Sequence, residues 1–200
     1  MEPSIHDRIL AAAKTLFLAN GFNGSNLRDI AKEAQVSMGG IYHHFGSKEE
    51  IYQALLNSNE VPIAFASIVG LFRDPVFPEN LGEIGAKIFD IVEAHRDFFK
   101  LLYIDVLEFQ ARNVNHVIQS FRKSISQQSV ALLKHRLDAG DMAEVHPAIV
   151  VRCMFDLFLN FGLEEVMTGG SFAADIGLTE RQLADQMARV ILYGAMRRDP

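Results

Sequence analysis

The chain has 200 residues, 49% hydrophobic and 22% charged, a composition typical of a soluble globular protein with room for one domain or for a small domain beside a larger one. Its 25 acidic residues outnumber its 19 lysines and arginines, and the net charge of −6 argues against non-specific coating of nucleic acid. The single cysteine, Cys153, excludes an internal disulfide and fits a reducing cytosol.

The chain opens with a predicted amphipathic helix that ends at Asn20 and Gly21. Apolar residues recur along one face of this helix, and the face consists of Ile5, Ile9, Ala12, Ala13, Leu16 and Phe17. Such a stripe must pack against other helices, so the pattern predicts a three-helix unit that the next two segments complete.

The segment from Leu27 to Lys48 holds two short helical patterns separated by a three-residue turn, which is typical of a helix-turn-helix. Asn26 is positioned to cap the first helix, and Asp29, three residues later, resembles the second member of a capping box. The apolar face of this helix is made of Leu27, Ile30, Ala31 and Ala34, whose two alanines permit close approach of a crossing helix.

The second helical pattern is shorter and begins at Ser37, which can accept a backbone N–H bond as its cap. Ile41 and Phe45, four residues apart, are its buried pair, and Gly46 is expected to end it in a left-handed conformation. The residues left on the outer side are Met38, Gly39, Gly40, Tyr42 and His43.

The stretch from Ile5 to Leu56 resembles the amino-terminal DNA-binding domain of the TetR family of bacterial transcriptional regulators. The resemblance is carried, in order, by ILAAAKTLFLANGF, LRDIAKEA, the VS turn, GGIYHHF and SKEEIYQALL. One position departs from the family pattern, because Gln35 stands where the turn usually has glycine. A left-handed Gln35 would cost about 1 to 2 kcal/mol, which a packed motif tolerates.

The helical pattern breaks between Asn57 and Pro62, because Asn and Ser are poor helix formers and proline cannot continue a helix. We therefore predict two domains, a helix-turn-helix DNA-binding domain over 1–57 and an effector-binding and dimerisation domain over 58–200. The second is also expected to be all-α, with helices over Leu81 to Ala94 behind an Asn80 cap, Asp97 to Phe109, Asn113 to Ala139, Pro147 to Glu165 and Thr179 to Met196.

Contacts to operator DNA are predicted for the second helix of the motif and its flanks, because an α-helix fits the major groove. A rotation of 100° per residue points Gly39 and His43 most directly away from the buried pair. The resemblance also implies that His44 touches phosphate. The predicted DNA-binding residues are Asn26, Arg28, Ser37, Met38, Gly39, Gly40, Tyr42, His43, His44 and Lys48. Residues 36–47 contain no Lys or Arg, which predicts a modest salt dependence of operator binding.

A reading helix contacts too few base pairs for genomic specificity, so a homodimer on a palindromic operator is expected. In the resembled family the last two helices form the dimer interface. Here their apolar faces contain Val150, Val151, Met154, Phe155, Phe158 and Leu159, then Leu183, Met187, Val190, Ile191 and Tyr193. The alternative is that one or both helices pack in the core of the monomer.

The second domain is rich in phenylalanine, and aromatic residues at helical spacing usually belong to a core. The resemblance implies that this domain encloses a small, largely apolar or aromatic effector, which releases a repressor from DNA. The candidate ligand-binding residues are Phe98, Tyr103, Phe109, Phe121 and Phe155.

Other functions find less support in the sequence. It contains no His-x-x-x-His, Cys-x-x-Cys, phosphate-binding glycine loop or nucleophile elbow, so we expect no enzyme, metal or cofactor. A helical protein-interaction adaptor that lacks specific DNA binding remains the alternative. We expect a cytoplasmic protein, since no secretory signal is present and the uncharged segment 61–72 is too short to span a bilayer. Cys153 lies in an apolar run and is expected to be buried.

Overall fold

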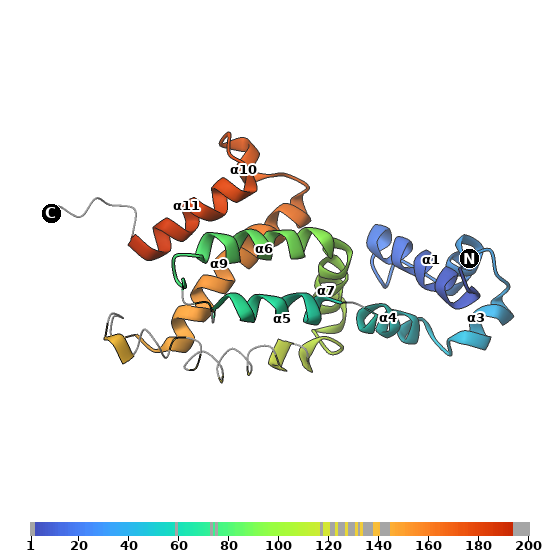
Figure 1. The fold of residues 1–200 in the computed structure, drawn as a ribbon. Coiled ribbons are helices and arrows are strands. Elements are labelled where there is room, and N and C mark those ends of the chain that lie inside the picture. Colours follow the sequence, from blue (N-terminus) through green and yellow to red (C-terminus); the bar gives the residue numbers. More distant parts are fainter. Residues whose placement is uncertain are drawn as a thin grey trace. The chain divides into compact units, whose positions relative to one another are not determined.

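The computed structural model describes residues 3–58, 60–72, 74, 76–116, 118–120, 123, 127, 131, 133, 138–140 and 145–193. Regular structure in these residues is helical, with no strand among them, so the predicted all-α class is confirmed (Figure 1). They form two compact units. The amino-terminal unit comprises residues 1–59 and 97–117, and the second unit comprises 60–96 and 118–200.

The amino-terminal unit is built from α1 (Ile5–Asn20), α2 (Leu27–Glu33), α3 (Met38–His44), α4 (Lys48–Asn57) and most of α7 (Arg96–Phe109). The periodic apolar positions of the sequence meet in its core, where Ile9, Phe17, Ile30, Ile41 and Tyr52 have no exposed surface. Ile5, predicted to share this face, lies in the first turn of α1 and is 46% exposed.

Each of the first four helices starts at a side-chain cap that accepts a backbone N–H bond. The caps are Ser4, Asn26, Ser37 and Ser47. The predicted caps Asn26 and Ser37 are thus confirmed. In the capping box, the carboxylate of Asp29 accepts from the Asn26 side-chain amide at 2.6 Å rather than from its backbone, which the short Asp side chain reaches less well.

The end of α3 differs from the prediction that Gly46 is left-handed. The helix ends at His44, the following Phe45 has an extended backbone (φ −143°), and Gly46 is not among the residues with positive φ. The carboxylate of Glu50 instead accepts the Gly46 N–H at 2.7 Å. A Cβ at position 46 would lie 3.1 Å from a Glu50 oxygen, so glycine serves here for close approach.

Helix α7 packs against α4 and the loop after α1. The Phe109 ring lies 4.5 Å from that of Phe22 and stacks on Tyr52 at 5.1 Å. Glu108 accepts the backbone N–H groups of Phe22 and Asn23 at 3.1 and 2.7 Å. The loop after α1 is therefore held by α7, far along the chain.

The second unit is organised around α6 (Leu81–Ala94), with α5 (Val61–Phe72) on one side and α11 (Glu180–Tyr193) on the other (Figure 1). Helix α9 (Pro147–Thr168) also packs on α6, and the short α10 (Phe172–Asp175) contacts α11. Glycines make the crossings close, because a Cβ on Gly85 would lie 2.3 Å from the Phe158 ring and one on Gly82 would meet Asp185.

Two predictions about this unit need correction or completion. Asn80 precedes α6 but makes no side-chain cap: its amide nitrogen donates to the Leu71 carbonyl at 2.9 Å, and its Oδ1, which would accept a backbone N–H in a cap, is buried without a hydrogen-bond partner among the described residues. Much of the predicted helix Asn113 to Ala139 lies outside the described residues. The remaining predicted helices end within three residues of their observed bounds, and Met196 lies outside the described part.

The segment Lys48–Phe72 is long and apolar enough to cross a membrane by length and composition alone, which is weak evidence for a span. Ile51, Tyr52, Leu55 and Leu56 in its first half are buried, and α4 packs against α1. Helix α4 ends at Asn57, so the predicted break is confirmed, but Pro62 lies in the first turn of a new helix, α5, which begins at Val61 and was not predicted. This break coincides with the boundary between the two compact units.

Candidate DNA-binding interface

Helix α3 presents the outward face that the helical rotation predicted. Gly39, Tyr42, His43 and His44 are exposed, and Tyr42 retains 58% of its surface. Ile41 and Phe45 are buried beneath them, which fixes the rotation of the helix. His44 is exposed although the wheel places it nearer the core, because it lies at the last position of the helix.

A shallow groove of about 540 Å³ runs beside this face, between α2 and α3. It is lined by Ser25, Asn26, Leu27, Arg28, Asp29, Met38, Tyr42 and Lys48. Five of these eight were predicted to contact DNA from the sequence, so the structure brings Asn26, Arg28, Met38, Tyr42 and Lys48 to one hollow. Ser37, Gly39, Gly40, His43 and His44 lie on or next to α3 outside this lining.

Two of the predicted contacts already have partners in the protein. The Ser37 oxygen accepts the Gly40 N–H at 3.0 Å, which leaves its hydroxyl proton for a phosphate. Lys48 donates to the carbonyls of Phe22 and Ser25 at 2.7 and 2.6 Å, and its Nζ lies 4.1 Å from the centre of the Phe22 ring. One N–H of Lys48 remains for DNA, and the other two hold the loop before α2.

The turn of the motif contains the left-handed residue that the sequence suggested, since Gln35 has φ 55°. A side chain that the sequence analysis missed supports it. Arg8 of α1 donates from one nitrogen to the carbonyls of Ala34 and Gln35, at 2.5 and 2.8 Å. A charged donor on these two oxygens offsets part of the strain of a non-glycine residue here.

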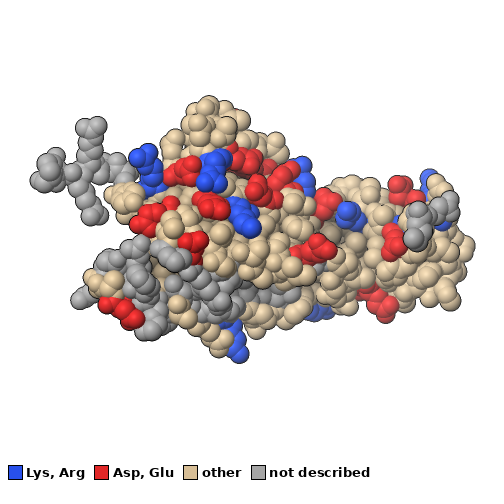
Figure 2. All heavy atoms as spheres, viewed as in Figure 1, with Lys and Arg blue, Asp and Glu red and all other residues tan. Residues whose placement is uncertain are grey.

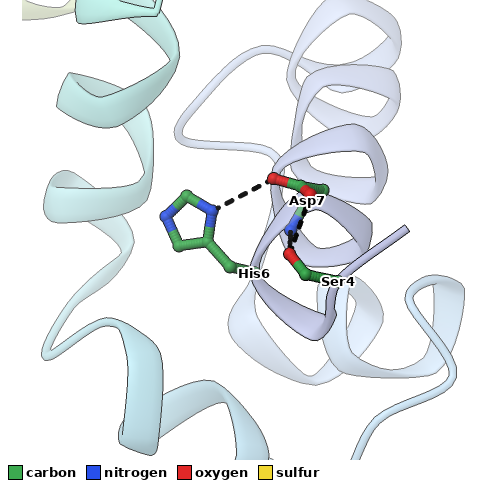
Figure 3. Close-up of polar contacts among 3 residues, drawn as sticks. All are labelled: Ser4, His6 and Asp7. Carbon is green, nitrogen blue, oxygen red and sulfur yellow. Dashed lines mark hydrogen bonds and ion pairs between the residues drawn. The ribbon is translucent and has the colours of Figure 1, made fainter. Parts of the chain in front are cut away.

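Three histidine rings gather at the end of α3. His43 and His44 lie 5.1 Å apart, His6 of α1 lies 6.1 Å from His44, and His6 stacks on the ring of Phe45 at 5.0 Å. The Nδ1 of His6 lies 3.4 Å from Oδ1 of Asp7, and Ser4 donates to the same carboxylate at 2.7 Å (Figure 3). The hydrogen bond from Ser4, then that from His6, lowers the pKa of Asp7.

His6 was not predicted as part of the site. Its position one turn into α1 carries no local signal, because the contact with α3 spans 38 residues. The one available hint was its residue type, because a histidine at the start of the first helix can pair with the aromatic rings at the end of the motif.

The candidate ligand-binding residues do not fall in one compact unit. Phe98, Tyr103 and Phe109 lie on α7 in the amino-terminal unit, where Phe109 packs on Phe22 and Tyr52. Phe155 is buried in the second unit, 5.4 Å from Phe65. Phe121 lies outside the described residues, and a role for these side chains in effector binding stays a prediction.

The last two helices use most of their predicted apolar faces inside the monomer. Val151, Met154, Phe155 and Phe158 of α9 and Leu183 and Met187 of α11 are buried, because they share the faces that pack on α6. The exposed apolar side chains of these helices are Ile149, Leu157, Val190 and Tyr193. Cys153 lies between Ile149 and Leu157 on the same exposed stripe of α9, so its predicted burial is wrong.

Charge on the second unit is concentrated over α6 and α11 (Figure 2). Glu180 lies near Glu165, Asp90 and Glu93, and partial burial, followed by the repulsion of these carboxylates, raises its pKa. Among the described residues, no group of three His, Cys, Asp or Glu side chains is placed to hold a metal ion.

Comparisons with known proteins agree with this geometry. The sequence pattern of the family described as "Bacterial regulatory proteins, tetR family" matches residues 9–55, which span α2 and α3 and most of α1 and α4. The HTH-type transcriptional regulator UidR of Escherichia coli K12 is 25% identical over 155 residues, 75% of this chain and 76% of UidR. The HTH-type transcriptional repressor AcnR of Corynebacterium glutamicum is 25% identical over 174 residues, 82% of each chain.

A solved structure shows the same fold over the whole chain. The TetR-family transcriptional regulator PfmR of Thermus thermophilus superposes with a TM-score of 0.65 at 22% identity, over 99% of this chain and 100% of PfmR.

Proposed function

Residues 9–55 make this chain a member of the TetR family of bacterial regulatory proteins, and from that premise we propose that it is a ligand-responsive repressor. Membership makes it a transcriptional regulator with a helix-turn-helix DNA-binding domain. The proposal adds that two copies bind a palindromic operator and that a small, largely apolar effector releases them. Repression is the habit of the resembled family, and AcnR, which shares 25% of its sequence over 174 residues, is named a repressor.

The observation that carries the proposal is the exposed face of α3 beside the groove lined by Asn26, Arg28 and Tyr42. Gly39 and Gly40 are open to close approach, since no atom lies within 3.4 Å of a Cβ built on either residue. Bare backbone on this face lets the helix sit deep in a major groove, while Tyr42 and His43 reach base edges or phosphates.

Selection of bound sequences from random double-stranded DNA, followed by gel shifts, tests this function. We expect a palindromic consensus, with half-sites separated by about one helical turn or a multiple of it. His43→Ala and Tyr42→Ala should each weaken binding by about tenfold or more, while His116→Ala, an exposed histidine away from α3, should leave it unchanged. Recovery of no consensus would contradict the proposal and favour the adaptor alternative.

The proposed dimer uses the exposed parts of α9 and α11. Cys153 offers a direct test, because it is the only cysteine in the chain and lies on the apolar stripe between Ile149 and Leu157. A short bis-maleimide should join two chains in the wild type and none in Cys153→Ser. Leu157→Glu should lower the dimer fraction, measured by analytical ultracentrifugation, by placing a charge in an apolar contact. A monomer at micromolar concentration would contradict the dimer.

The proposed effector acts by linkage. A ligand that prefers a conformation with wrongly spaced reading helices weakens DNA binding, typically by about 1 to 3 kcal/mol of coupling. The break between α4 and α5, with Pro62 in the first turn of α5, is the proposed mechanical link. Apolar and aromatic compounds can be screened for release of the bound operator, and Pro62→Ala should change the response. An unchanged response and an unchanged affinity would remove Pro62 from the mechanism.

A further inference from the structure

The end of α3 carries a chain of imidazole rings that the proposed function does not explain. His43, His44 and His6 lie in succession, with ring centres 5.1 and 6.1 Å apart, and His6 rests on the buried ring of Phe45. His43 and His44 are exposed and His6 is half-buried, so all three can meet a ligand at this surface. We call His6, His43 and His44 the imidazole ladder.

The orientation of His6 decides what its free nitrogen can do. Its Nδ1 lies 3.4 Å from Asp7 Oδ1. The Ser4 hydroxyl donates to the Asp7 carboxylate and accepts the Asp7 backbone N–H, which holds this carboxylate in place (Figure 3). Because an ionised Asp7 can only accept, this contact favours a proton on Nδ1, and the Nε2 of the neutral ring is then an acceptor, which repels a phosphate oxygen. In this tautomer protonation turns Nε2 into a donor, so His6 binds phosphate as an imidazolium.

Helix α3 brings no permanent cation of its own to the ladder, so the lysines and arginines near it all come from other helices. The charged groups on α3's neighbours are Asp7, Arg8 and Lys14 of α1, Arg28, Asp29, Lys32 and Glu33 of α2, and Lys48, Glu49 and Glu50 of α4. Arg8 is turned to the carbonyls of Ala34 and Gln35, and Glu50 to the N–H of Gly46. Helix α3 itself has no Lys or Arg, so its histidines are its only cationic side chains.

We propose that the imidazole ladder is a phosphate-binding site whose His6 of α1 must be protonated, so that operator binding takes up protons. The inference rests on the proposed function of operator binding. Histidine has an ordinary pKa of about 6.5, and a nearby phosphate favours the charged ring. Affinity should therefore be highest at low pH and fall as the pH rises through the pKa values of the bound state.

Operator affinity at pH 6.0, 7.0 and 8.0 and constant ionic strength, measured by fluorescence anisotropy, tests the inference. Each proton taken up weakens binding by at most about tenfold per pH unit in this window, and we expect a net uptake of protons by each chain. The variant His6→Phe keeps a ring to stack on Phe45 but cannot be protonated. It should lose about tenfold in affinity at pH 6.0 and less than twofold at pH 8.0, with a flatter pH dependence. His116→Asn, the matched control, should keep the wild-type slope.

A second measurement does not depend on how well the variant folds. The Cε1 proton of His6 can be followed by NMR through a pH titration of the wild type, free and bound to operator, and the pKa should be higher in the complex. Specific binding with no pH dependence, an unchanged slope in His6→Phe, or an equal pKa in both states would overturn the inference while leaving the proposed function standing. Absence of specific binding at every pH would overturn both.

Discussion

Tyr52 of α4 donates a buried hydrogen bond to the carbonyl oxygen of Leu101 in α7, with 2.5 Å between the two oxygens. The bond joins residues 49 positions apart and lies under the ring cluster of Phe17, Phe22 and Phe109. Tyr52→Phe should lower the free energy of unfolding by about 0.5 to 1.5 kcal/mol, the usual contribution of such a bond. Urea denaturation measures the change, and Tyr42→Phe, whose ring is exposed, should stay within about 0.5 kcal/mol of the wild type.

The same phenol predicts a loss of stability in alkali. Burial, followed by the charges of Asp105 and Glu108, raises the pKa of Tyr52 well above its ordinary value. The neutral phenol is therefore favoured in the folded state, and its contribution is complete below pH 10 and is lost as the pH rises from there toward the folded-state pKa. Stability should fall by up to about 1.4 kcal/mol per pH unit above pH 10 from this group. Tyr52→Phe should have a shallower decline, and an identical decline would contradict the assignment.

Replacement of the left-handed residue in the turn should stabilise the protein. Gln35 is exposed with φ 55°, so Gln35→Gly removes the strain of a side chain in this region and loses little packing. We expect a gain of about 0.5 to 1 kcal/mol in the free energy of unfolding, after allowing for the greater freedom of glycine in the unfolded chain. Gln186→Gly, at an exposed position inside α11, should instead lose about 1 kcal/mol. A loss at both positions would show that Gln35 is not strained.

Two helical glycines should respond in opposite directions to alanine. Gly85 of α6 is buried against Phe158, and a Cβ there would lie 2.3 Å from the ring, so Gly85→Ala should cost about 1 to 3 kcal/mol. Gly70 of α5 has no atom within 4 Å of a Cβ, and Gly70→Ala should gain up to about 1 kcal/mol from helix propensity. Thermal unfolding followed by circular dichroism compares them, and a gain in both would mean that α6 and α9 can separate freely.

Lys48 should stabilise the fold even without DNA. It donates to the carbonyls of Phe22 and Ser25 and lies over the Phe22 ring. Lys48→Met should therefore lower the free energy of unfolding by about 1 to 3 kcal/mol. Lys14→Met, which breaks an exposed ion pair with Asp97, should change it by less than about 1 kcal/mol. If both variants changed the free energy of unfolding by the same small amount, Lys48 would not stabilise the fold, and only its predicted phosphate contact would remain.

Features that depend on neighbours along the chain were predictable from the sequence. The caps at Asn26 and Ser37, the buried pair Ile41 and Phe45, and the outward face of α3 all follow from helical geometry. The left-handed Gln35 followed from family resemblance rather than from physical chemistry, since a non-glycine residue there is locally unfavourable.

Features that depend on tertiary contacts were missed. Arg8 on the turn, His6 on Phe45 and Glu108 on the loop after α1 join distant segments, and no local pattern announces them. Cys153 was mistaken for a core residue because it lies in an apolar run, although helical rotation turns it to the surface between Ile149 and Leu157. Asn is a common capping residue, but the Asn80 side chain makes no cap on α6 and its amide nitrogen donates to the Leu71 carbonyl.

The contacts of α7 with α4 and with the loop after α1 bear on how this protein can be dissected. The amino-terminal unit is discontinuous along the chain, because its last helix, α7, follows α5 and α6 in the sequence and is synthesised after them. A fragment stopped after α4 would leave the Phe22 and Tyr52 rings without Phe109 and the loop without Glu108. Studies of the isolated amino-terminal unit therefore require a fused α7 or the intact chain. During synthesis, this unit cannot reach its final packing until the ribosome has passed residue 109.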